Sequence, residues 1–384
     1  MTTKKVLLVN IAPQKTGVGN YLKLILKYGN LKYDVLNISL FRKTQSSDYP
    51  SSINGKTFFY NARYNSLIFN FLFTYLGIDK GRLTNYLDKI NEKYDAILLD
   101  QQDLAIYAPL FNKKFHCNVF ITVHDAGYFR HAKIHPYRFF INKNLKALKN
   151  NNIKGISYDS DNTKNEIIKK YGDILDKGKT IELTVDSNIY KIRDMIESRK
   201  KLNLPLDKII VLNVGKDGYV KNIKNFLKSL IYIKNDNILF LRVGKLIESE
   251  KYFNEIPDEI KKKIIIREDI SDCDLPYYYS ASNIFVFPSI KEGFGLEILE
   301  AQLSGNIVIT TNREPMNKIV LSSASLLIND PFNPMEIAGL IEKSAMNYSS
   351  MKNKLIQDYK SYAERFSINR FIEETEKLLT NNQQ

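Results

Sequence analysis

The segment from Phe285 to Thr311, FVFPSIKEGFGLEILEAQLSGNIVITT, has the residue types of an anion-binding turn. Its pattern predicts a strand, a glycine-containing loop, a helix that begins near Leu296, and a further strand. Gly293 and Gly295 allow a phosphate to approach the backbone, and the positive end of the helix is directed at the same place. The segment therefore predicts a site for a phosphorylated ligand.

Two glutamates belong to this turn. Glu292 lies in the loop, and Glu300 lies about one turn into the predicted helix. Two carboxylates beside a diphosphate would repel it, so hydroxyl groups are their expected partners. A ligand that combines phosphate, ribose and sugar hydroxyls satisfies both requirements.

Two lysines follow another predicted strand, in VLNVGKDGYVK from Val211 to Lys221. This segment resembles the strand of the family 4 retaining glycosyltransferases that ends in G-R and is followed by K, and the resemblance implies that Lys216 and Lys221, after Gly215, hold a diphosphate. Two ordinary surface lysines are the alternative interpretation in a chain with 56 Lys and Arg residues.

Near the N-terminus, a predicted strand leads through PQKTGVGN into a helix. This segment resembles the glycine loop of the same family, and the resemblance implies that Gly17 and Gly19 let a ligand approach the backbone. The third glycine of a dinucleotide fingerprint and the lysine of a P-loop are both missing, which argues against NAD and ATP. A glycine turn that caps a helix is the alternative. His124 and Asp125 follow the strand 118–123 in TVHD, and the same resemblance implies that they are cleft residues, with His124 as a catalytic candidate. Asp125 either orients the histidine or caps the next turn.

Taken together, these motifs resemble those of the family 4 retaining glycosyltransferases, whose donor loop reads E-G-F-G-L-P followed by L-E-A. The residues that fall in register are Glu292, Gly293, Phe294, Gly295, Leu296, Leu299, Glu300, Ala301 and Gly305. The resemblance implies the GT-B fold, in which two Rossmann-like doubly wound α/β domains face a central cleft. It also implies that Glu300 binds the nucleotide ribose, that Glu292 contacts the donor sugar near the reacting carbon, and that His124 lies across the cleft from that sugar.

Three positions depart from the family pattern. Lys216 replaces an arginine and gives up its bidentate fork, Thr184 stands where glycine is usual, and Glu297 occupies the position of a proline. Glu297 either touches donor hydroxyls or repels phosphate, so the identity of the donor sugar stays open.

Short apolar runs alternate with longer amphipathic stretches along the chain, which is typical of parallel strands joined by helices. Strands are predicted at 6–11, 33–38, 94–99, 118–123, 209–214, 238–243, 263–267, 283–287 and 307–310. We expect an N-terminal acceptor-side domain over 1–190 and a nucleotide-sugar-binding domain over 191–366. A C-terminal helix within 367–384 is expected to pack back on the first domain.

Composition limits the function further. The formal charge of +14 favours a polyanionic partner, and the basic, aromatic segment 128–154 suits an anionic membrane surface or a solvated helix equally well. Two distant cysteines indicate free thiols and a cytoplasmic location, and no apolar run approaches the length of a membrane span. No metal-ligand spacing is present, and no cofactor is expected.

The sequence thus predicts a metal-independent hexosyltransferase with a nucleotide-sugar donor, for which UDP or GDP is favoured over ADP. The resemblance implies that the reaction retains the anomeric configuration. The acceptor is a glycan or a lipid-linked molecule, with peripheral membrane contact. A basic nucleic-acid-binding protein is the alternative, but it leaves Glu292 and Glu300 unexplained. An inactive GT-B partner protein is a second alternative, motivated by the three departures.

Overall fold

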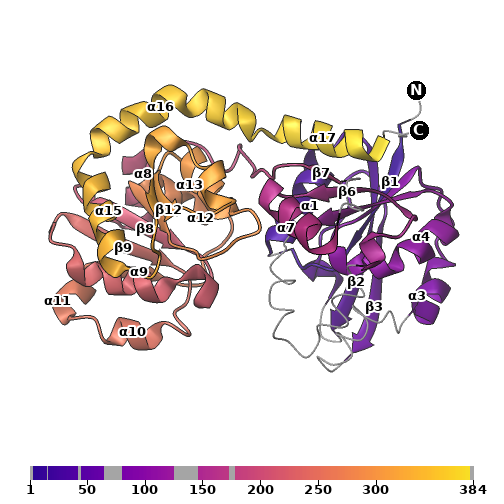
Figure 1. The fold of residues 1–384 in the computed structure, drawn as a ribbon, viewed down its shortest axis with the longest axis horizontal. Coiled ribbons are helices and arrows are strands. Elements are labelled where there is room, and N and C mark those ends of the chain that lie inside the picture. The colour runs from indigo at the N-terminus through magenta and orange to yellow at the C-terminus, as the bar shows by residue number, and fades with distance from the viewer. Residues whose placement is uncertain are drawn as a thin grey trace. The chain divides into compact units, whose positions relative to one another are not determined.

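The computed structural model describes residues 3–14, 16–41, 45–64, 80–124, 146–172 and 178–380. The chain forms two compact units (Figure 1). The first contains Met1–Thr184 together with Ile368–Gln384, and the second contains Val185–Ser367. Asp125 and most of the basic segment, residues 128–145, lie outside the described residues.

The first unit is built on a seven-stranded sheet with the order β3-β2-β1-β4-β5-β6-β7, and all of its strand pairs are parallel. Its strands are β1 (Lys5–Asn10), β2 (Lys32–Phe41), β3 (Thr57–Tyr64), β4 (Ala96–Leu99), β5 (Asn118–Val123), β6 (Ile153–Tyr158) and β7 (Gly178–Thr180). The central strands are apolar on both faces because helices cover a parallel sheet from both sides.

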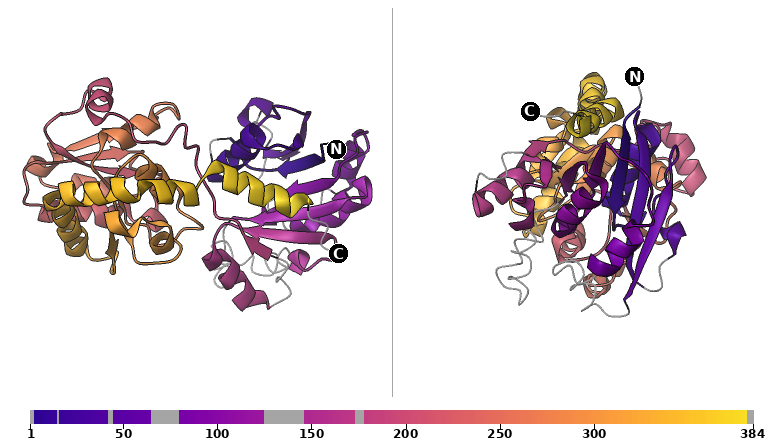
Figure 2. Two further views of the ribbon diagram at one scale, coloured as in Figure 1. Left: turned by 90° about the horizontal axis from the view of Figure 1, so that it is seen from above. Right: turned by 90° about the vertical axis from the view of Figure 1, so that its right-hand side faces the viewer.

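The described helices of this unit are α1 (Gly17–Tyr28), α3 (Lys80–Leu87), α4 (Ala108–Phe115), α7 (Asp161–Tyr171) and α17 (Ile368–Thr380), with 3-10 turns η1 (Ser46–Asp48) and η2 (Gln102–Tyr107). Figure 2 shows α17, in yellow, on this unit. Glu376 of α17 accepts hydrogen bonds from the backbone N–H groups of Asn30 (2.6 Å) and Leu31 (3.1 Å), and from the hydroxyl of Tyr33 (2.9 Å). One carboxylate therefore fixes the C-terminal helix to the first unit.

The second unit contains a six-stranded parallel sheet with the order β10-β9-β8-β11-β12-β13. Its strands are β8 (Ile209–Val214), β9 (Ile238–Val243), β10 (Ile264–Arg267), β11 (Ile284–Phe287), β12 (Ile307–Thr311) and β13 (Ser325–Ile328). The chain runs outward from β8 to β10 and then returns to β11 on the other side of β8. This reversal leaves a switch point between β8 and β11, where ligands commonly bind at the carboxyl ends of the strands.

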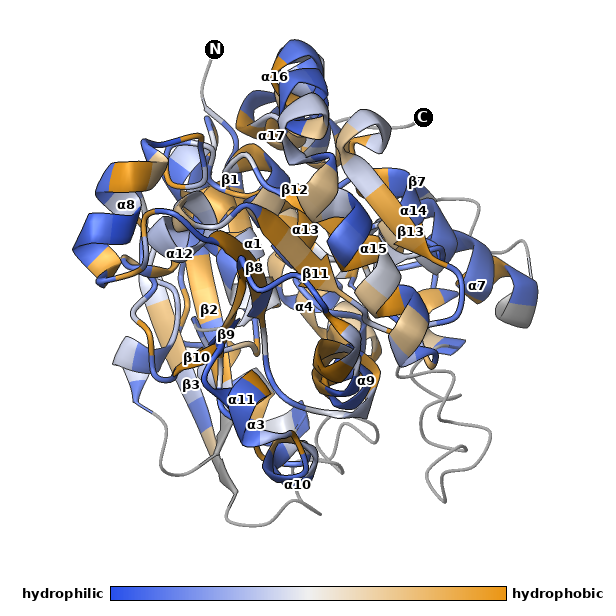
Figure 3. Ribbon diagram, turned by 90° about the vertical axis from the view of Figure 1, so that its left-hand side faces the viewer, coloured by the Kyte–Doolittle hydropathy of each residue, from blue (hydrophilic) through white to orange (hydrophobic). Residues whose placement is uncertain are grey.

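The described helices of the second unit are α8 (Met195–Leu202), α9 (Ile223–Ser229), α10 (Glu250–Asn254), α11 (Asp258–Lys261), α12 (Leu275–Ala281), α13 (Leu296–Leu303), α14 (Met316–Ile319), α15 (Pro334–Met346) and α16 (Tyr348–Arg365), with 3-10 turns η4 (Tyr219–Lys221), η5 (Leu230–Tyr232) and η6 (Ser322–Ala324). In Figure 3 the strands β8, β11 and β12 carry the apolar colour, whereas α10 and α16 carry much polar colour. One apolar core joins β8, β9, β11 and β12 to α9 and α15.

The prediction of two doubly wound α/β domains is confirmed. The strands at 118–123, 209–214 and 238–243 have the predicted bounds. Sequence reasoning missed β3, β6, β7 and β13. Three of these lie at sheet edges, where partial exposure removes the continuous apolar signal of a buried strand.

Candidate functional site

The candidate site of the second unit lies at the switch point between β8 and β11. The loop after β8 begins with Gly215, and the loop after β11 runs from Pro288 to the start of α13. Because both strands are parallel neighbours, their carboxyl ends meet at one edge of the sheet. The topology thereby brings together Lys221 and Glu297, which are 76 positions apart in sequence.

The loop after β11 is held in place by Ser289. Its Oγ lies 2.5 Å from Glu292 Oε1 and 3.0 Å from the carbonyl oxygen of Val220. The backbone N–H of Ile290 donates to the same carbonyl at 2.8 Å, and Thr311 Oγ1 donates to the carbonyl of Ser289 at 2.8 Å. These bonds fix the orientation of Glu292 in the absence of a ligand, as a preorganised binding loop requires.

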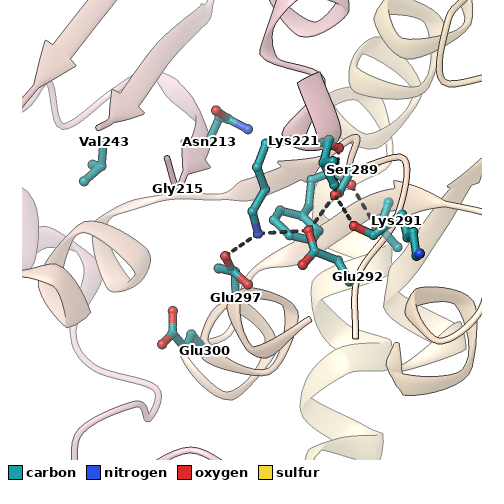
Figure 4. Close-up of polar contacts among 12 residues, drawn as sticks. Asn213, Gly215, Lys221, Val243, Ser289, Lys291, Glu292, Glu297 and Glu300 are labelled. Carbon is teal, nitrogen blue, oxygen red and sulfur yellow. Dashed lines mark hydrogen bonds and ion pairs between the residues drawn. The ribbon is translucent and has the colours of Figure 1, made fainter. Parts of the chain in front are cut away.

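Lys221 forms the centre of the site (Figure 4). Its Nζ lies 2.9 Å from Glu292 Oε1 and 2.7 Å from Glu297 Oε1, and 4.5 Å from the centre of the Phe287 ring. The structure thus brings together Lys221, which was predicted to bind the donor, and Glu292, which was predicted to be catalytic. It also adds Glu297, which the sequence marked only as a departure from the family pattern.

The charges of this cluster depend on one another. Burial lowers the pKa of Lys221, but Glu297 and Glu292 outweigh burial and raise the pKa above its usual value. Burial raises the pKa of Glu292, and this rise is opposed by Lys221 and by the hydrogen bond from Ser289. Lys221 is therefore a permanent cation at neutral pH, and it is shared by two carboxylates.

Glu300 is buried one turn further along α13. The hydroxyl of Tyr279 donates a hydrogen bond to Glu300 Oε2 at 2.7 Å. Burial, with the nearby charge of Glu297, raises the pKa of Glu300 to about 8, while hydrogen bonds from Tyr279 and Tyr190 oppose the rise. Glu300 can consequently be protonated at neutral pH and can exchange hydrogen bonds with ligand hydroxyls. Sequence reasoning missed both tyrosines, which carry no local motif.

The start of α13 supplies backbone donors. Gly295 is the N-cap residue with φ of 105°, and no side chain caps the helix among the described residues. The N–H groups of Leu296 and Glu297 therefore lack the usual side-chain acceptor, whereas the N–H of Ile298 donates to the carbonyl of Gly295 at 3.0 Å. Gly293 lies in the loop before them. Phe294 is buried and packs edge-on against Phe366, with 6.4 Å between ring centres, so its role is to anchor the loop.

Gly215 borders the cluster from the β8 side. Its φ is 132°, and a Cβ atom there would lie 3.9 Å from both Glu297 Oε1 and Lys221 Cε. Its carbonyl accepts a hydrogen bond from Arg242 Nη2 at 2.5 Å. Burial lowers the pKa of Arg242 to about 10.

Unlike Lys221, Lys216 is exposed and makes no ion pair within the described ranges of the chain.

His124 belongs to a separate cluster in the first unit. It directly follows β5, and Asp100 and Asp159 directly follow the neighbouring strands β4 and β6. Its Nδ1 lies 3.0 Å from Asp159 Oδ2, and its Nε2 lies 3.3 Å from Asp100 Oδ1. The ring of Tyr21 packs edge-on against the imidazole, with 4.9 Å between ring centres.

Two aspartates hold His124 in its charged form. Burial lowers the pKa of His124, but Asp159 and Asp100 outweigh it and raise the pKa to about 10. Burial raises the pKa of Asp100 to about 7. Sequence reasoning missed both aspartates, although each follows a strand end in the same way as His124. Asp125 lies outside the described residues.

The two N-terminal glycines lie at the start of α1. Thr16 Oγ1 accepts a hydrogen bond from the N–H of Gly19 at 3.0 Å, which caps the helix. A Cβ atom at Gly19 would lie 2.3 Å from the carbonyl oxygen of Pro13, so the turn itself requires glycine there. Gly17 is exposed at the first position of α1.

Two kinds of feature are absent from the described residues. No group of three or more His, Cys, Asp or Glu side chains has the arrangement of a metal site within those ranges. In the same ranges no helix is both long and apolar enough to cross a membrane.

Comparison with known proteins supports the description of the second unit. Residues 194–365 match the family model of the glycosyl transferases group 1, and this range covers most of the unit. The second unit belongs to the glycosyl transferases of group 1. The match contains Gly215, Lys221, Glu292, Glu297 and Glu300, so the cluster described above lies inside the group 1 region.

Whole-chain comparison extends this result to the fold. The chain is similar to sucrose-phosphate synthase of Thermosynechococcus elongatus, with a TM-score of 0.78, 17% identity and coverage of 98% of both chains. It is also similar to HepE of Anabaena in complex with UDP and glucose, with a TM-score of 0.74, 15% identity, and coverage of 98% of this chain and 99% of that one. The fold is therefore GT-B.

A curated relative is the O-antigen chain mannosyltransferase RfbU of Salmonella typhimurium. It is 28% identical over 242 residues, which make up 59% of this chain and 64% of that protein. The matched part of the chain thus spans less than two thirds of the length of RfbU.

Proposed function

We propose that the protein is a glycosyltransferase that takes a hexose from a nucleotide-sugar donor, UDP- or GDP-linked, and transfers it to a glycan or lipid-linked acceptor. The observation that carries this proposal is the cluster at the switch point of the group 1 unit. Lys221, the start of α13 and Glu300 lie there together, beside a glycine that permits close approach. RfbU, a mannosyltransferase, and the HepE complex with UDP and glucose support this donor class.

The cluster offers a role for each part of the donor. Lys221 and the first N–H groups of α13 would stabilise the negative charge that develops on the departing nucleoside diphosphate. Glu300, with its raised pKa, would exchange hydrogen bonds with the ribose hydroxyls. Glu292, fixed by Ser289, would contact the sugar. These contacts would need no metal ion, and retention of the anomeric configuration is part of the proposal.

The acceptor side of the proposal rests on the first unit. His124 would present a cationic imidazole at the carboxyl end of β5. Peripheral contact with an anionic membrane through 128–154 remains a prediction, as does the cytoplasmic location.

Donor binding is the first test. The purified chain would be titrated with UDP, GDP and ADP and with their sugars by calorimetry, with EDTA present throughout. We expect one nucleotide series to bind, and we expect Glu300→Gln to weaken that binding by up to about tenfold, because the amide nitrogen that replaces one carboxyl oxygen cannot accept a hydrogen bond from a ribose hydroxyl. Glu259→Gln is the matched control, because Glu259 is exposed in the first turn of α11.

Product formation is the second test. NMR of the anomeric proton would show whether a new glycosidic bond forms and whether its configuration matches the donor. Donor binding without donor turnover would favour an inactive partner protein. Tight binding of a nucleic acid, with no affinity for any nucleotide-sugar, would overturn the proposal.

A further inference from the structure

Glu297 occupies a position on Lys221 that a donor also needs. It is the second residue of α13, and its Oε1 lies 2.7 Å from Lys221 Nζ, slightly nearer than Glu292 at 2.9 Å. The side chains of Lys221 and Glu297 are 22% and 24% exposed, so the pair is reached by solvent only in part. Figure 4 shows Lys221 directed at both carboxylates.

The negative charge around Lys221 opposes the binding of an anionic ligand. One ammonium group faces two carboxylates, and two of its three N–H donors are directed at them. Glu297 Oε1 also lies 3.9 Å from the position of a Cβ on Gly215, so it fills the space between the β8 loop and Lys221. A diphosphate that approached Lys221 and the start of α13 would meet a like charge at this point.

Glu292 is held more firmly than Glu297, so a ligand phosphate would not displace it from Lys221 as easily. Ser289 Oγ lies 2.5 Å from its Oε1, and the loop that carries it is tied to Val220 and Thr311. Among the described residues, Lys221 is the one ion-pair partner of Glu297. Glu297 is therefore the carboxylate that can leave Lys221 at the lower cost.

We infer that Glu297 takes the place of the donor diphosphate on Lys221 in the free protein, and that donor binding displaces it. The inference rests on the proposed function. Glu297 then lowers the affinity for the donor, because a diphosphate that takes over the N–H donor now directed at Glu297 must first break the contact between Lys221 and Glu297. Ligands with two phosphates displace it more readily than ligands with one, since their charge is greater.

Glu297→Gln tests the inference. It removes the competing charge and keeps the size of the side chain, and Glu259→Gln removes an equal charge from an exposed helix start. Kd values for the nucleoside diphosphate that binds the wild type, and for its monophosphate, would be measured by calorimetry. We expect Glu297→Gln to bind the diphosphate about tenfold more tightly, with a smaller gain for the monophosphate, and Glu259→Gln to match the wild type.

Thermal unfolding separates competition from a purely structural role. Without ligand, Glu297→Gln should unfold at the same or a lower temperature, because it loses an ion pair. With saturating diphosphate its stabilisation should exceed that of the wild type. If the wild type binds the diphosphate and Glu297→Gln binds it equally or more weakly, this inference is overturned and the proposed function is not. Absence of nucleotide binding in both proteins would overturn the proposed function with it.

Discussion

Lys221→Met removes the cation at the centre of the donor cluster and keeps most of the aliphatic stem beside Phe287. The change leaves Glu292 and Glu297 close together without their shared counter-ion. Breaking a fully buried ion pair typically costs about 3–5 kcal/mol. Because these three side chains are 15–24% exposed, solvent screening reduces the expected loss to about 2 kcal/mol at pH 8. For a domain of this size that loss lowers Tm by about 4–8 °C.

The loss should depend on pH with a defined sign. The folded-state pKa of Lys221 is raised, so its stabilisation is present at all pH values below its unfolded pKa and is lost only as the pH rises through the higher folded value. In the variant, Lys221 no longer opposes the effect of burial on Glu292, whose pKa then rises further. Glu292 can take up a proton as the pH falls, so the deficit should shrink between pH 8 and pH 5.

Calorimetric unfolding at pH 8 and pH 5 checks this prediction, with Lys354→Met as the control because Lys354 is exposed on α16. Donor turnover should also fall about a hundredfold, which is typical for the loss of one preorganised electrostatic contact. A deficit below about 0.5 kcal/mol at pH 8, or one of equal size at both pH values, would refute the account of the cluster.

Three further perturbations test other parts of the structure. His124 should stay doubly protonated at pH 8, which NMR of its ring carbons can show, and its contribution to stability should be lost as the pH rises from its unfolded value toward about 10; a neutral ring at pH 8 would contradict the Asp100 and Asp159 geometry. Gly295→Ala should lower the stability of the second unit by about 1–3 kcal/mol because of its φ of 105°, whereas Gly339→Ala, in the exposed middle of α15, should raise it by about 0.5–1 kcal/mol; equal effects in unfolding experiments would argue against backbone strain. Glu376→Gln should weaken the attachment of α17 to the first unit and speed amide hydrogen exchange in that helix. Unchanged exchange would show that the apolar face of α17 is sufficient to hold the helix on the first unit.

Much of the fold is visible in the sequence. Buried parallel strands are continuous apolar runs, so β5, β8 and β9 could be located to the residue. The edge strands β7 and β13 could not, because GKT carries no apolar run and SLLI is only half-buried. β6 is central but is interrupted by Lys154 and Gly155, which hides its pattern.

The local chemistry of the donor loop is also a property of sequence. The spacing of Glu292, Gly295 and Glu300 follows from a loop and one helical turn, which residue types and periodicity specify. The sequence could name Lys216 and Lys221 as cations, but it could not tell them apart. Strand order brings the loop after β8 beside the acidic loop, and the path of that loop through η4 places Lys221 on Glu292 and Glu297 while Lys216 stays exposed.

Partners that are distant in sequence were decided by tertiary structure alone. Lys221 and Glu297 are 76 positions apart, and His124 lies 24 and 35 positions from Asp100 and Asp159. Local propensity carries no information on which strands become neighbours, since pairing depends on burying both faces of the whole sheet. The sequence by itself therefore determined the elements and the residue types at their ends. Only the assembled sheets decided which of those charges meet, and hence which pKa values are shifted.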